Sequence, residues 1–161
     1  MDSQSYISHL QLHAHPEGGY FGEHYRSSLN LDLPEFQGLR SASTAIYFLL
    51  EAGQFSALHA IRSDEIWHFY DGDPLEIVEL DSQGNWTSTL LGRDLLAGQK
   101  LSHCVPAGHW FGSRPAPGSI FSLVGCTVAP GFDFQDFEMP DQSWFLDRFP
   151  NLEQKIRLFT R

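Results

Sequence analysis

The sequence predicts a mainly β domain, an antiparallel sandwich or barrel of short strands, with two short helices at its C-terminal end. Three observations predict this class. Strand-like segments rich in β-branched and aromatic residues dominate residues 19–128. Turn sequences separate them about every 8–12 residues, as is typical of sandwiches and barrels. The apolar pattern becomes that of amphipathic helices only after residue 140.

The strand segments alternate with Gly, Pro, Asp and Asn clusters that favour turns. A typical turn is Asp71-Gly72-Asp73-Pro74, and another is Pro106-Ala107-Gly108. The expected strands, in chain order, are Gly19–Ser27, Ala42–Leu50, Phe55–Ile61, Glu65–Tyr70, Leu75–Leu80, Trp86–Leu91, Lys100–Val105, His109–Ser113 and Ser119–Val128.

The C-terminal segment predicts two short helices packed on the sheet. Asp141 is a suitable N-cap for the first helix, and apolar residues follow it at helical spacing. Pro150 separates this helix from a second amphipathic segment that starts at Asn151.

The chain has 161 residues, which suits one domain with one core. We expect that domain to span residues 1–161. Its parts would be an N-terminal strand segment at 10–30, a barrel core at 40–130 and C-terminal helices at 140–160.

The formal net charge of −10 bears on the partners of this protein. An acidic chain does not neutralise phosphates, so we expect no nucleic acid and no anionic membrane as partner. The N-terminus lacks the basic and apolar regions of a secretory signal. Cys104 and Cys126 lack a CxxC spacing and lie among apolar residues, which predicts buried, reduced thiols and a cytoplasmic location.

Two histidine-containing segments resemble the motifs of the cupin superfamily. Gly53, His59, Ile61, Glu65 and Gly72 follow the spacing G-x5-H-x-H-x3-E-x6-G, with Ile61 in place of the second histidine. The second motif, G-x5-P-x-G-x2-H-x3-N, is similar to the segment from 98 to 111. There the first gap has seven residues instead of five, and Phe111 holds the histidine position.

A narrower resemblance covers nearly the whole chain. It rests on the strings HPEGGYFGEHYRSS, STAIYFLL, SDEIWHFYDGDPLEI, VPAGHWF and LVGCTVAPGFDFQDFE. These resemble a family of small bacterial and fungal cupins of unknown function, which has distant similarity to dTDP-sugar epimerases and germins. The resemblance implies a cupin jelly-roll, or double-stranded β-helix, and a homodimer. It implies no particular reaction.

His59 and Glu65 are the candidate metal ligands, with a divalent metal as the possible cofactor. Alternate residues of a strand face one side, so His59 and Ile61 should share the barrel interior. A cupin metal centre uses three histidines and one carboxylate, and here Ile61 and Phe111 replace two of the donors. His68, His103 and His109 are the candidate substitutes, although His68 should face the opposite side of its strand.

The alternative role of His59 and Glu65 is acid–base chemistry. An imidazole takes and gives protons near neutral pH, and a carboxylate can orient it. In this hypothesis His59 is the catalytic base, Glu65 its orienting partner, and Tyr47 or Tyr25 the acid. A structural alternative is that His59 and Glu65 form a buried hydrogen-bonded pair without a catalytic role.

Further residues are candidates for ligand binding. Arg26 and Arg62 could bind an anionic group, and the aromatic residues could form either a pocket wall or plain core. The full candidate set for ligand binding is Arg26, Tyr25, Arg62, Trp67, His68, Trp110 and Phe111.

The sequence therefore predicts a cupin that binds a small polar metabolite inside its barrel. The first functional hypothesis is an epimerase or isomerase that uses a histidine base. The second is a metal-dependent oxygenase or hydrolase, and the third is a non-catalytic ligand-binding module. No P-loop, GxGxxG, HExxH or G-x-S-x-G motif supports a different class of enzyme.

Overall fold

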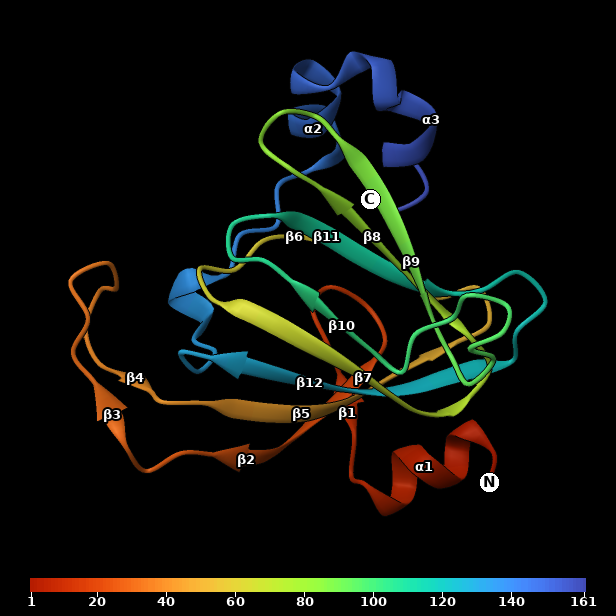
Figure 1. The fold of residues 1–161 in the computed structure, drawn as a ribbon, viewed down its shortest axis with the longest axis horizontal. Helices are drawn as coiled ribbons and strands as arrows, with labels where there is room; N and C mark the ends of the chain where they lie inside the picture. The colour runs from red at the N-terminus through yellow and green to blue at the C-terminus, as the bar shows by residue number, and fades with distance from the viewer.

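The computed structural model describes residues 1–161 and contains two large antiparallel sheets that face each other (Figure 1). Their strands have the order β1-β2-β5-β12-β7-β10 in the six-stranded sheet and β6-β11-β8-β9 in the four-stranded sheet. The six strands are β1 (His13–Ala14), β2 (Tyr20–Arg26), β5 (Thr44–Glu51), β12 (Phe121–Ala129), β7 (Asp64–Gly72) and β10 (Ser102–Val105). The four strands are β6 (Ser56–His59), β11 (Trp110–Pro115), β8 (Leu75–Leu80) and β9 (Trp86–Leu91).

The last long strand, β12, lies between two much earlier ones. It pairs with β5 on one side, where Leu123 faces Leu49, and with β7 on the other, where Cys126 faces Trp67. All nine predicted strands are present, with ends that differ from the prediction by at most two residues. The predicted mainly β class is confirmed.

The main core lies between the sheets, because strand residues alternate between the two faces. On β7, Glu65 and Trp67 are buried, whereas Ile66 is exposed. Twelve buried residues form this core: Phe48, Leu50, Ile61, Trp67, Leu75, Ile77, Leu91, Val105, Phe111, Val124, Cys126 and Val128.

The C-terminal helices cover the outer face of the four-stranded sheet (Figure 1). These are α2 (Gln142–Arg148), a 3-10 turn η2 (Pro150–Leu152) and α3 (Glu153–Ile156). The Asp141 side chain accepts a hydrogen bond from the Trp144 amide, so the predicted N-cap is confirmed. A second core joins the helices to the sheet and contains Leu58, Val78, Leu80, Phe145, Ile156 and Phe159.

Several short elements escaped prediction. Helix α1 (Ser3–His9) packs Tyr6 and Ile7 against a third apolar cluster around Leu49 and Leu123. The short strands β3 (Asn30–Leu31) and β4 (Arg40–Ser41) pair as an arm beside the six-stranded sheet, and η1 (Phe134–Asp136) follows β12 (Figure 1). None of the helices has the length and apolar character needed to cross a membrane.

The two cysteines differ in their surroundings. Cys126 is buried in the main core, as predicted, but Cys104 is exposed, which corrects the prediction of two buried thiols. The apolar neighbours of Cys104 along the chain do not decide its burial, because its position on β10 alternates with that of the buried Val105.

Candidate functional site

A cavity of about 290 Å³ lies between the two sheets. Its lining comes from β2, β5, β7 and β12 of the six-stranded sheet and from His59 at the end of β6. The turn that contains His15 and Glu17 and the loop from Phe132 to Phe137 complete the lining. The cavity brings together three residues that the sequence singled out, His59, Glu65 and Arg26.

His59 has a close polar contact at each of its ring nitrogens. Its Nδ1 lies 2.7 Å from the Ala57 carbonyl oxygen, and its Nε2 lies 3.1 Å from Glu17 Oε2. A carbonyl oxygen only accepts hydrogen bonds, so Nδ1 carries a proton. The orienting partner of His59 is therefore Ala57, and not Glu65 as the sequence predicts.

Glu17 and His59 lie close enough to exchange a proton. Burial lowers the pKa of His59 and raises the pKa of Glu17, and both shifts favour the neutral forms. In these forms Glu17 carries a proton, and Nε2 of His59, 3.1 Å from Oε2 of Glu17, carries none. Glu17 can accept another proton only if the proton that it holds moves to Nε2 of His59.

Glu65 is the second proton-handling group of the cavity. Its side chain is 7% exposed, and burial raises its pKa to about 7, although the nearby His59 opposes this shift. The neighbouring Glu17 raises the pKa further, and the Cys126 thiol lowers it. A carboxyl group with this pKa exchanges its proton readily at neutral pH.

The turn at residues 15–19 aims His15 and Glu17 into the cavity. Gly18 has φ +116°, and a Cβ atom there would lie 2.1 Å from the Phe55 carbonyl oxygen, so the turn requires glycine. The carbonyl group of Glu17 accepts hydrogen bonds from the Ala57 amide and from Arg161. The Glu17 amide donates to Nδ1 of His15, and burial lowers the pKa of His15.

Sequence reasoning missed His15 and Glu17 as interior residues. The string HPEGG indicated a tight turn, yet nothing in it shows that the turn packs against β6. The signal that could have found them is the position of polar residues beside two consecutive glycines, immediately before an otherwise apolar strand.

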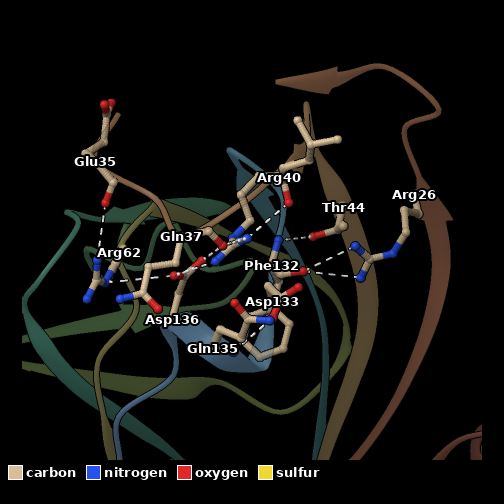
Figure 2. Close-up of polar contacts among 11 residues, drawn as sticks. Arg26, Glu35, Gln37, Arg40, Thr44, Arg62, Phe132, Asp133, Gln135 and Asp136 are labelled. Carbon is tan, nitrogen blue, oxygen red and sulfur yellow. Dashed lines mark hydrogen bonds and ion pairs between the residues drawn. The ribbon is translucent and has the colours of Figure 1, made fainter. Parts of the chain in front are cut away.

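Arg26 lies at the cavity rim and is already engaged. Its Nε and Nη2 donate to the carboxylate of Glu23 at 2.9 and 2.7 Å, and both Nη atoms donate to the Phe132 carbonyl oxygen at 3.3 Å. The Phe132 amide in turn donates to Thr44 Oγ1 at 2.9 Å. Figure 2 shows how these contacts join β2 and β5 to the loop.

A buried ion pair holds the other end of this loop. The Arg40 guanidinium donates to both carboxylate oxygens of Asp136, at 2.6 and 3.0 Å (Figure 2). Arg62 extends toward the same Asp136 and donates to the Glu35 carbonyl oxygen. Arg62 does not line the cavity and does not pair with its neighbour Asp64, so its predicted ligand-binding role has no geometric support.

Three predicted residues face away from the cavity. Tyr47 lies on the outer face of β5, because it alternates with Ile46 and Phe48, and its ring lies beside His24 and Tyr70. Tyr25 is 51% exposed and follows a bulge in β2. Neither tyrosine can act as the acid opposite His59, which corrects that prediction.

His68 also faces outward, where its Nε2 lies 3.2 Å from Thr127 Oγ1, as the alternation along β7 predicted. Its proposed ligand contact is therefore corrected as well. The remaining candidates are core residues. Trp67 and Phe111 are buried in the main core, and Trp110 packs against Trp144 and Phe145 of α2.

The donor set around His59 does not fit a divalent metal. Nδ1 of His59 is bonded to the Ala57 carbonyl oxygen, and Ile61 and Phe111 place hydrocarbon where a cupin metal centre has imidazole. His103 pairs with Glu79 at 2.5 Å. No group of three or more His, Cys, Asp or Glu side chains is arranged as metal ligands.

Comparison with known proteins identifies the family. Residues 4–140 match the family described as Cupin superfamily (DUF985). The chain belongs to this cupin family. Its membership confirms the resemblance seen in the sequence and the cupin jelly-roll fold with short C-terminal helices.

Three cupin relatives are similar along most of their length. Protein SO0799 from Shewanella oneidensis is 37% identical with a TM-score of 0.92, over 100% of this chain and 98% of that one. A hypothetical protein from Leishmania major is 36% identical with a TM-score of 0.92, over 99% of both chains. The uncharacterized protein YML079W of Saccharomyces cerevisiae is 30% identical over 145 residues, 83% of this chain and 72% of the yeast protein.

Proposed function

We propose that this cupin binds a small polar metabolite in its cavity and transfers protons to and from it, as an isomerase or epimerase does. The observation that carries the proposal is Glu65, a buried carboxyl group with a pKa of about 7 that faces the cavity beside the Glu17–His59 pair. Pairs of titratable groups with tuned pKa values are typical of acid–base catalysis.

In the proposed step, Glu17 takes the proton from a carbon next to a carbonyl group. The proton that Glu17 already held moves to Nε2 of His59, which becomes an imidazolium ion. His59 is then the base that stores the proton, and Glu17 relays it. The hydrogen bond from Nδ1 to the Ala57 carbonyl oxygen keeps the ring in the orientation that this transfer needs.

Glu65 supplies the complementary proton. In its neutral form it donates to the carbonyl oxygen of the substrate, which balances the charge that develops when the carbon loses its proton. Glu17 then returns its proton to the former carbonyl carbon while ionised Glu65 takes the proton of the neighbouring hydroxyl group, which gives the isomer and restores both residues.

Hydrogen–deuterium exchange into small sugars tests the proposed chemistry. The protein would be incubated in D2O with D-glucose, D-fructose, dihydroxyacetone and D-glucosamine, and exchange next to the carbonyl group followed by proton NMR. We expect exchange with the wild-type protein, and a loss of about 100-fold or more in His59→Gln and in Glu65→Gln. His24→Gln and Glu35→Gln, exposed residues outside the cavity, are the matched controls.

A direct titration tests the proposal without a substrate. The carboxyl carbon of Glu65, assigned by its absence in Glu65→Gln, should titrate in carbon-13 NMR with a pKa of about 7. A value near that of an ordinary exposed glutamate, about 4.3, would overturn the acid–base role. Binding of a sugar without any exchange would instead support a non-catalytic binding module.

A further inference from the structure

The cavity has an excess of acidic groups that its one arginine does not neutralise. Among its lining residues are the carboxyl groups of Glu17, Glu23, Glu65 and Asp133, and a single guanidinium, that of Arg26. Because Arg26 donates to Glu23 through two nitrogens and to the Phe132 carbonyl oxygen, it has little capacity left for a ligand. An anionic ligand would therefore meet carboxyl groups without a free cation to pair with.

Glu65 is a member of this acidic set that lacks a strong hydrogen-bond donor. Its side chain is more than nine-tenths buried, yet no N–H group of the protein donates to its carboxyl oxygens. Only the weak thiol donor of Cys126 lies beside it. A buried carboxyl group without a strong donor indicates that a group absent from the chain supplies one.

Aromatic rings complete the surroundings. Phe21, Phe132, Phe134 and Phe137 all line the cavity. The rings of Phe132 and Phe134 lie 5.0 Å apart at 80°, and those of Phe134 and Phe137 lie 5.9 Å apart at 70°. Rings set at steep angles to one another present both faces and edges, and their faces attract cations.

We propose that the ligand of this cavity carries a cationic nitrogen, an ammonium or quaternary ammonium group that lies against the phenylalanine rings and is paired with Glu65. This deepens the proposed function, because it names the class of molecule that the same cavity takes. An amino sugar or amino ketone satisfies both requirements. Its ammonium group pairs with ionised Glu65 on binding and passes a proton to it, and neutral Glu65 then donates that proton to the neighbouring carbonyl oxygen.

Pairs of probes that differ only in charge test this class. Choline would be compared with 3,3-dimethyl-1-butanol, its uncharged analogue of the same shape, and ethanolamine with ethylene glycol. Isothermal titration calorimetry of the full chain should give affinities for at least one cationic probe about tenfold or more above its neutral partner. Acetate should not bind detectably.

Two variants assign the preference to the cavity. We define the cation preference as the affinity for a cationic probe divided by the affinity for its neutral partner. Glu65→Gln should reduce this ratio to near one, whereas Glu35→Gln, on the exposed surface, should retain it. Phe134 is 56% exposed, so Phe134→Leu should leave the fold intact, which thermal unfolding would show. The variant should still lower the affinity for the cationic probe more than the affinity for the neutral one.

The failures of the two proposals are distinguishable. Equal affinity for both members of both probe pairs, or tighter binding of acetate, would overturn the proposal that the ligand is cationic. Neither result would change the expected pKa of Glu65. A cation preference that persists in both Glu65→Gln and Phe134→Leu would place the cation elsewhere and also overturn the proposal. An ordinary pKa for Glu65 in the empty protein would instead overturn the proposed proton transfer.

Discussion

At the scale of single residues, Glu65 combines a functional advantage with a cost to folding. Its burial raises the pKa to about 7, so the folded protein holds a proton that the unfolded chain loses near pH 4.5. Stability therefore falls as the pH rises through this window, because the unfolded state binds fewer protons. A shift of this size corresponds to roughly 3 kcal/mol.

Replacing Glu65 should remove this pH dependence. We compare the free energy of unfolding of Glu65→Gln with that of the wild-type protein. The difference should increase in favour of the variant by roughly 3 kcal/mol as the pH rises from about 4.5 to about 8, since glutamine has no charge to desolvate. Urea unfolding at a series of pH values measures the difference. Glu35→Gln should show a difference near zero throughout, and a constant difference for Glu65→Gln would contradict the buried titration.

At the scale of elements, the pair Arg40–Asp136 joins β4 to the η1 turn and so fixes the loop that carries Phe132, Phe134 and Phe137. Both side chains are buried, 3% and 6% exposed. The attraction of a buried pair is largely offset by desolvation, but removal of one partner leaves an uncompensated charge in the interior. The pair therefore positions the loop more than it adds net stability.

Single and double replacements distinguish these two effects. Arg40→Met should cost about 3–5 kcal/mol, whereas Arg40→Met combined with Asp136→Leu should recover most of that loss. Urea denaturation measures both. Arg157→Gln breaks an exposed pair with Glu153 and should cost less than about 1 kcal/mol. A double variant as unstable as the single one would show that the pair itself stabilises the fold.

At the scale of the whole molecule, we propose that the protein is a homodimer, as the family resemblance implies. Sedimentation equilibrium at micromolar concentration should give twice the chain mass of 18.2 kDa. The arm of β3 and β4 extends beside the six-stranded sheet and is available for such a contact (Figure 1). A mass of one chain at all concentrations would contradict the proposal.

The sequence alone determined the strands, the C-terminal helices and the inward position of His59 and Glu65. Each of these follows from local information, since alternation along a strand, turn residues and capping residues act within a few neighbours. The motif spacing also showed that Ile61 and Phe111 replace two metal ligands.

Only the tertiary structure decided which groups meet His59. Glu17 reaches it from a turn far earlier in the chain, held by the Ala57 amide and by Arg161 at the other end of the sequence. The engaged state of Arg26 and most of the phenylalanine rings of the cavity likewise depend on a loop that returns after the last strand. Charge, burial and pKa arise from all the neighbours in space, and periodicity along a chain carries no information about neighbours that distant segments supply.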